Sequence, residues 1–197
     1  STRSPVFLFD IIAHPYTLCQ SLAPHAKTGY NSGERKAGGS PMEREEYMRQ
    51  ALALAEEAAG HGDVPVGCVV VKDGAVIGRG CNRREERGDA VAHAEVEAIR
   101  QACRAVGGWN LHDCALYVTL EPCPMCAGAI INARVGTVCY GARDEKAGAC
   151  GSVLDLFAER FNHRPRVYGG VLKEACAALL RDFFHNLRKN SPDFPQN

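Results

Sequence analysis

The stretch CALYVTL, residues 114–120, constrains the fold of this chain more than any other feature of the sequence. A strand with one solvated face alternates apolar and polar side chains, whereas this stretch is almost continuously apolar, which is typical of a strand buried on both faces. Helical patterns lie before and after it in the chain, at residues 93–106 and 124–133. We therefore predict an α/β protein of three layers, α/β/α, with a mixed sheet of about five strands flanked by helices.

The other elements are predicted from shorter patterns. VGCVVV and AVIGRG are apolar runs joined at Lys72-Asp73-Gly74, and Asp-Gly between such runs predicts a hairpin because both turn positions favour positive φ. Hydrophobic periodicity and turn residues predict the remaining elements. These are helices at 43–59, 153–161 and 173–189, strands at 136–140 and 167–171, and a glycine-rich loop at 141–151.

The two ends of the chain differ from its middle. KTGYNSGERKAGGSP is rich in glycine, serine and charge, which is typical of a flexible linker, and the helical pattern begins just after it. We expect residues 1–41 to be an N-terminal extension without stable structure. Residues 42–190 would form the functional domain, and residues 191–197 a C-terminal tail.

The composition excludes several classes of protein. No apolar run approaches the roughly 20 residues of a membrane-spanning helix, so we expect no membrane association. The ten cysteines lie mostly in apolar runs, where a free thiol acts as a small hydrophobic group, and this favours a reducing, cytoplasmic location. Lys plus Arg equals Asp plus Glu at 23 each, so only a local basic patch could attract an anionic partner.

Two short motifs carry residues that bind metals or move protons. HAEVEAIR begins at His93 and includes Glu95, and EPCPMC places Cys123 and Cys126 three residues apart. Each motif lies at the start of a predicted helix, where prolines are tolerated and where the positive end of the helix favours thiolates. One metal ion could therefore lie between two helix N-termini, bound by one imidazole and two thiolates.

This donor set suits zinc, which binds nitrogen and sulfur ligands in a tetrahedron. A structural zinc site normally has four protein ligands, but only three are evident here, although His112 could be proposed as a fourth. An open position would hold a water molecule whose pKa zinc lowers from about 16 towards 7, and Glu95 could accept and return its proton. We predict catalytic zinc, with structural zinc as the alternative.

At these residues the sequence resembles the zinc-dependent nucleoside and nucleobase deaminases, and more closely the bacterial tRNA-specific adenosine deaminases, which convert the wobble adenosine of an anticodon to inosine. The similarity runs through VPVGCVVV, HAEVEAIR, LYVTLEPCPMCAGAIINAR, GARDEKAGACGS and CAALLRDFF. The resemblance implies a cytidine deaminase-like fold and one Zn²⁺ per subunit. It assigns the metal to His93, Cys123 and Cys126 and the catalytic proton shuttle to Glu95.

The resemblance also implies a tRNA anticodon stem-loop as partner and a homodimer. Asn82 would contact the target nucleoside, and Asp144 would accept a hydrogen bond from a ribose hydroxyl, which DNA lacks. Arg143, Lys146 and Phe184 complete the predicted substrate-binding residues. Subtracting the four basic and two acidic residues of 1–41 from 23 of each sign leaves a net charge of −2, so RNA binding requires cations gathered locally. The candidates are Arg83, Arg84, Arg143, Lys146, Arg188 and Lys189.

The sequence leaves two alternative functions open. A guanine or cytosine deaminase acting on free bases would share the HAE and EPCPMC motifs, and only the loop at 141–152 and the RDFF helix favour tRNA. A non-catalytic, zinc-stabilised RNA-binding module would also keep the metal ligands, but it would have no use for Glu95.

Overall fold

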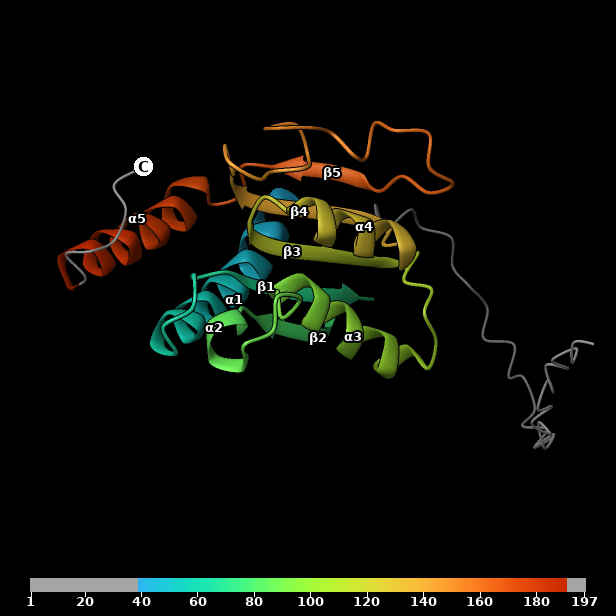
Figure 1. Ribbon diagram of the computed structural model, residues 1–197. Helices are drawn as coiled ribbons and strands as arrows, with labels where there is room; N and C mark the ends of the chain where they lie inside the picture. The colour runs from blue at the N-terminus through green and yellow to red at the C-terminus, as the bar shows by residue number, and fades with distance from the viewer. Residues whose placement is uncertain (1–38, 191–197) are drawn as a thin grey trace, which may run out of the picture. The chain divides into compact units, whose positions relative to one another are not determined.

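The computed structural model describes residues 39–190, which form a central mixed sheet with helices on both faces (Figure 1). The strands, in the spatial order β2-β1-β3-β4-β5, pair antiparallel from β2 through β1 to β3 and parallel from β3 through β4 to β5. Their bounds are β1 Gly67–Lys72, β2 Ala75–Cys81, β3 Cys114–Leu120, β4 Thr137–Ala142 and β5 Arg166–Gly169. The helices are α1 Pro41–Gly60, α2 Arg84–Arg87, α3 Ala94–Val106, α4 Pro124–Asn132 and α5 Lys173–Asn190. The predicted α/β class and five-stranded mixed sheet are confirmed.

Burial of both faces of β3 accounts for its almost continuously apolar sequence. Leu116 and Val118 of β3 belong to the core beneath α3 and α4, whereas Ala115 and Tyr117 face the other way, towards the side chains of α1. Both sets are buried, so neither face of the strand tolerates a polar alternation. The hairpin between β1 and β2 is also as predicted, because Asp73 and Gly74 have φ values of 50° and 81°.

Glycines in β2 allow α3 to lie unusually close to the sheet. A Cβ atom at Gly78 would meet the backbone of Ala98 and Ala102, and one at Gly80 would meet the backbone of Ala94 and Ala98. Only the absence of side chains at these two positions allows the approach. The first turn of α3 is therefore seated directly on the end of β2.

One predicted helix is wrong. Residues 153–161 form turns, not a helix, after an isolated bridge between Cys150 and Asp155. The Asp155 carboxylate accepts hydrogen bonds from the backbone N–H groups of Phe157 and Ala158 at 3.0 and 3.2 Å, and the N–H of Leu156 is donated to the carbonyl of Ala149. These local partners replace the helical ones.

The short helix α2 was not predicted, because four residues show no periodicity. The extension expected at 1–41 lies outside the described residues except for its last three, and the tail expected at 191–197 lies wholly outside them. Ser40 caps α1 in a capping box with Glu43, so the ordered helix starts at Pro41. Within residues 39–190, no helix combines the length and apolar character needed to cross a membrane.

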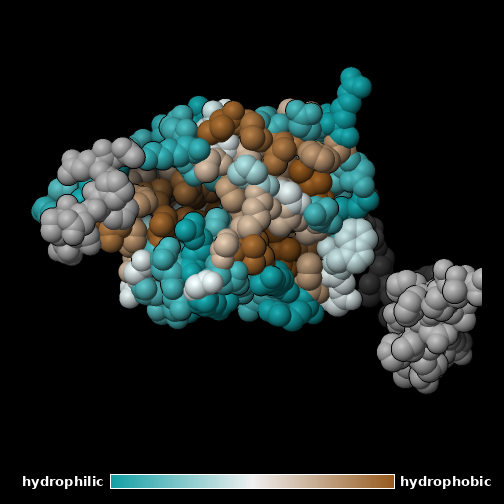
Figure 2. Space-filling view, viewed as in Figure 1, coloured by the Kyte–Doolittle hydropathy of each residue, from teal (hydrophilic) through white to brown (hydrophobic). Residues whose placement is uncertain are grey.

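Hydrophobic side chains also reach the surface on one side of the domain. Figure 2, in the view of Figure 1, shows them gathered over α4 and the segment that links β4 to β5, whereas the face over α2 and α3 is more hydrophilic. In that linking segment Val153, Leu154 and Phe161 are exposed.

Candidate metal centre and substrate cavity

The two motifs meet at the N-termini of α3 and α4. His93 is the N-cap of α3 and Cys123 is the N-cap of α4, with Pro124 as the first helical residue. Neither N-cap side chain is used to cap its own helix, which leaves the imidazole and the thiol free for another role. Cys126 lies in the first turn of α4 and is buried.

The donor atoms of His93, Cys123 and Cys126 all lie within 4.8 Å of one another. The Nδ1 atom of His93 is 3.8 Å from the Sγ of Cys123 and 3.6 Å from that of Cys126. Zinc–nitrogen and zinc–sulfur bonds of about 2.05 and 2.3 Å at a tetrahedral angle separate such atoms by roughly 3.6 Å. The arrangement therefore suits zinc, and among the described residues no other group of three His, Cys, Asp or Glu converges in this way.

The two thiols differ in proton affinity. A hydrogen bond from Cys126, helped by His93, lowers the pKa of Cys123 to about 4, so Cys123 is a thiolate at neutral pH. The same hydrogen bond, together with burial, raises the pKa of Cys126. The hydrogen bond with Cys123 also raises the pKa of His93. The thiols of Cys123 and Cys126 and the imidazole of His93 are thus linked by hydrogen bonds. A cation bound between them would displace the protons that these hydrogen bonds use.

Glu95 stands beside this cluster, on the first turn of α3, and is 3% exposed. Its Oε2 atom is the one buried side-chain oxygen or nitrogen in residues 39–190 that lacks a hydrogen-bond partner. Burial raises the pKa of its carboxyl group. Because a buried carboxylate oxygen without a partner is destabilising, this side chain is suited to exchanging protons with a molecule that enters the site.

A cavity of about 240 Å³ opens onto these groups. His93, Glu95 and Cys123 line it together with Asn82, which is buried. The side-chain oxygen of Asn82 accepts the backbone N–H of Ala94 at 3.0 Å, so the amide nitrogen is the group that remains to donate to a ligand. Further lining residues are Asp63, Val64, Val66, Arg84, Glu85, Leu120, Glu121, Asp144 and Ala147.

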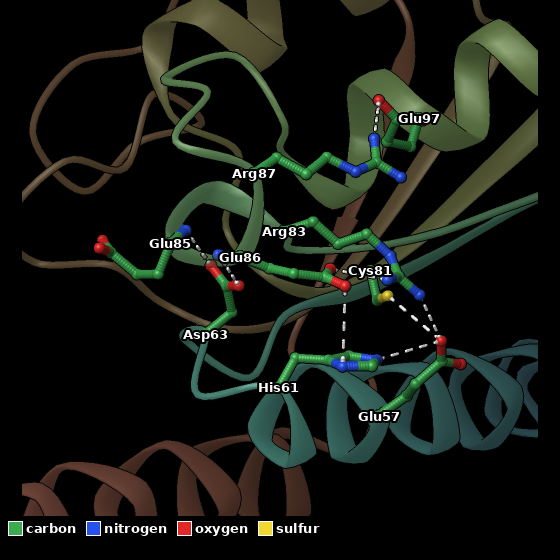
Figure 3. A network of polar contacts seen from close by, with 9 residues as sticks. All are labelled: Glu57, His61, Asp63, Cys81, Arg83, Glu85, Glu86, Arg87 and Glu97. Atoms are coloured by element: carbon green, nitrogen blue, oxygen red, sulfur yellow. Dashed lines mark hydrogen bonds and ion pairs between the residues drawn. The ribbon is translucent and has the colours of Figure 1, made fainter.

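One wall of the cavity is held by a buried carboxylate. Asp63, 1% exposed, accepts the backbone N–H groups of Glu85 and Glu86 at 2.9 and 3.2 Å, and thereby caps α2 from outside the helix (Figure 3). Arg84, which begins α2, lines the cavity and has 53% of its side chain exposed.

The neighbouring arginine has a different role. Arg83 donates to Glu57 and to Glu86, both at 2.7 Å, and ties α2 to the end of α1 (Figure 3). His61 lies 3.7 Å from Glu57 and 4.0 Å from Glu86 in the same network. Arg83 and Arg84 are both among the cations that the sequence offered for RNA binding. Arg83 is held by Glu57 and Glu86, whereas Arg84 lines the cavity and has a longer contact, 3.5 Å, with Glu85.

The opposite wall belongs to the loop after β4. Asp144 lines the cavity, and its Oδ1 accepts the N–H groups of Lys146 and Ala147 at 3.0 and 3.1 Å, so the second carboxylate oxygen remains for a ligand. Arg143 and Lys146 are exposed and do not line the cavity. Phe184 does not line it either and packs edge-on against Phe183 with ring centroids 5.4 Å apart.

Three charged residues of the cavity were not expected from the sequence: Asp63, Glu85 and Glu121. Glu121 directly follows the buried strand β3, and acidic residues at the carboxyl end of a parallel strand commonly reach a binding site. The position of Glu121 after β3 could therefore have identified it from the sequence. Nothing local marks Asp63, because its partners on α2 are distant in the chain.

Comparisons with known proteins agree with this geometry. Residues 42–188 match the family of MafB19-like deaminases. The tRNA-specific adenosine deaminase of Bacillus subtilis is 48% identical over 144 residues, which is 73% of this chain and 89% of that protein. A solved structure from work on A-to-I editing by tRNA:A34 deaminases at the wobble position shares 45% identity, with a TM-score of 0.67 over 68% of this chain and 99% of that one.

A larger relative contains only a part that resembles this chain. The tRNA(Ile)-lysidine synthase of Deinococcus radiodurans is 48% identical over 166 residues, which is 83% of this chain but 28% of that protein. The Bacillus subtilis deaminase and the solved structure named above are matched over 89% and 99% of their own lengths. This chain belongs to the MafB19-like deaminase family and, within it, to the tRNA-specific adenosine deaminases.

Proposed function

We propose that the protein converts the wobble adenosine of a tRNA anticodon to inosine. Water adds at C6 of adenine, the C6–N bond breaks, and ammonia leaves. The observation that carries the proposal is the buried Glu95 carboxylate, whose Oε2 has no hydrogen-bond partner, beside the convergent His93–Cys123–Cys126 cluster in the cavity.

The metal is part of the proposal. His93, Cys123 and Cys126 would hold one zinc ion, because the spacing of their donor atoms suits tetrahedral nitrogen and sulfur coordination. When bound, zinc supplies the Lewis acidity that makes water a nucleophile at neutral pH. Glu95 accepts the proton of that water and returns it to the departing amine. Asn82 orients the nucleoside through its free amide N–H₂.

Burial of Glu95 favours an enzyme over a zinc-stabilised binding module. A module that only folds around zinc gains nothing from a buried carboxylate oxygen without a hydrogen-bond partner, and such an atom costs about 1–3 kcal/mol of stability. That cost is expected where the carboxylate performs chemistry.

The charged groups around the cavity support an RNA substrate. Arg84 offers a cation at the rim, and the free carboxylate oxygen of Asp144 can accept a ribose 2′-hydroxyl. Arg143 and Lys146, exposed on the same loop, would contact phosphates. Phe184, on the more distant α5, would contact the stem-loop farther from the target base.

Three further parts of the proposal concern the whole protein. Residues 42–190 would carry the activity without the flanking segments, in the cytoplasm, where tRNA is found. Two copies would associate through α4 and the segment that links β4 to β5, where Val153 and Leu154 are exposed. Truncation to 39–190 with full activity and light scattering at twice the chain mass would support these points; a monomeric active protein would refute the dimer.

The decisive experiment offers the full chain four substrates: an anticodon stem-loop RNA with adenosine at the wobble position, the same stem-loop with guanosine there, free guanine and free cytosine. Inosine formed in the first RNA alone is the expected result. Deamination of free guanine or cytosine with no reaction of the stem-loop would favour the alternative function on free bases.

A further inference from the structure

The loop that forms one cavity wall is wrapped around a single buried carboxylate. Glu121 is 2% exposed and follows β3 directly. Its Oε1 accepts the backbone N–H groups of Cys150 and Ser152 at 2.9 and 3.1 Å, and its Oε2 accepts the N–H of Asp144 at 3.2 Å. The hydroxyl of Ser152 also donates to Oε2. One side chain thus satisfies donors at both ends of the segment 144–152.

The fit around this carboxylate leaves no room for a side chain. A Cβ atom at Gly148 would lie 2.5 Å from the carboxyl carbon of Glu121 and 2.6 Å from the carbonyl oxygen of Asp144. Gly148 is buried, and its N–H is donated to that same carbonyl at 2.8 Å. The glycine therefore lets the loop close over Glu121.

Apolar packing cannot hold the RNA-facing half of the loop. Residues 145–147 are exposed, and Asp144 is only partly buried. Besides Glu121, the neighbouring anchor is the N–H of Ala149, which donates to the carbonyl of Pro122 at 2.8 Å. Charge-assisted hydrogen bonds are about twice as strong as neutral ones, so the carboxylate adds a strong restraint at Asp144 to the bond that its carbonyl accepts from Gly148.

We propose that Glu121 is a positioning residue that orders the loop 144–152 before RNA binds. The inference rests on the proposed function and deepens it, because it assigns substrate affinity to a cavity-lining carboxylate whose two oxygens are both engaged by the loop. A preordered loop loses less conformational entropy on binding than a mobile one. Loss of the carboxylate should therefore weaken RNA binding while the chemical step continues.

The principal test is Glu121→Gln in the full-length protein, with Asp155→Asn as matched control. Asp155 is another loop carboxylate that accepts two backbone N–H groups, but it does not line the cavity. Steady-state kinetics on the stem-loop RNA separate KM from kcat, and zinc content and thermal midpoint are measured on the same samples. The dissociation constant for the RNA is measured in a Glu95→Ala background, where no turnover disturbs binding.

For Glu121→Gln we expect KM and the dissociation constant to rise about tenfold, kcat to stay within about threefold, and zinc to remain bound, because two or more charge-assisted hydrogen bonds are lost. Asp155→Asn should leave all these values unchanged. Ser152→Ala, which deletes one donor and leaves the carboxylate, is a milder variant in case Glu121→Gln fails to fold, and a threefold rise in KM is expected.

Three results would overturn the inference. One is an unchanged KM in a folded, zinc-loaded Glu121→Gln or Ser152→Ala protein. Another is a loss of zinc and a fall in kcat with KM unchanged, which would mean that Glu121 holds the metal ligands Cys123 and Cys126 in place and does not order the loop. The third is an equal effect from Asp155→Asn. Failure of the proposed function is distinct, because the unmodified protein would then form no inosine.

Discussion

Substitution of Gly80 by alanine tests whether the seat of α3 on β2 sets the geometry of the site. A Cβ at this position would lie 2.8 Å from the backbone nitrogen of Ala98 and 2.9 Å from the Cβ of Glu97, and closer still to the carbonyl oxygen of Ala94. Backbone atoms cannot move aside as a flexible side chain can. The first turn of α3 must therefore shift by about 1 Å to reach van der Waals contact.

The magnitude follows from two opposing effects. Overpacking costs about 1–3 kcal/mol of unfolding free energy. Replacing glycine also restricts the unfolded chain, which stabilises by about 0.4–1 kcal/mol. The difference lies between about 0 and 2.6 kcal/mol, and its midpoint of about 1.3 kcal/mol corresponds to a fall in Tm of roughly 3–5 °C for a chain of this length. His93 and Glu95 lie at the displaced N-terminus of α3, so their side chains would move from their positions in the site. We therefore expect kcat to fall by up to about 100-fold.

The matched control is Gly60→Ala at the end of α1, where no atom lies within 4 Å of the new Cβ. It should keep full activity and an equal or higher Tm. Thermal unfolding followed by circular dichroism and inosine formation on stem-loop RNA measure both effects. If Gly80→Ala matched the control in Tm and in kcat, the reasoning about the helix seat would be wrong.

The remaining predictions concern single groups of the site. Glu95→Ala should lower kcat by about 10²–10⁴-fold with zinc retained, and metal analysis beside the kinetics checks this; retention of kcat would refute the proton-shuttle role. Removing the metal with a chelator should abolish activity and lower Tm, and added zinc should restore both unless Cys126 is replaced by serine. Arg84→Ala should raise the dissociation constant for RNA and reduce its salt dependence by about one unit of slope, whereas Arg83→Ala should mainly lower stability, by about 1 kcal/mol, in urea titrations. Equal effects of the two arginines on the salt slope would contradict the assignment.

Several features could be predicted from the sequence because their causes are local. The Asp73-Gly74 turn depends on two positive φ values. The nearly continuous apolar side chains of residues 114–120 predict that this strand is buried on both faces. The candidate ligands His93, Cys123 and Cys126 could be recognised in the sequence for the same reason, because each motif lies at the N-terminus of a single helix. The error at 153–161 is also local in origin, because the Asp155 carboxylate competes for N–H groups that a helix would use.

The sequence by itself indicated which residues are candidates to bind a metal and move a proton, and that a sheet covered on both faces would carry them. Tertiary structure alone decided which charged groups line the cavity and which are paired within the fold. Arg83 and Arg84 are adjacent and chemically identical, yet Glu57 on α1 engages Arg83, whereas Arg84 lines the cavity beside Glu85. Glu121 and Asp63 gain their roles from backbone N–H groups more than twenty residues away. Such pairings depend on long-range geometry, which no local pattern in the chain records.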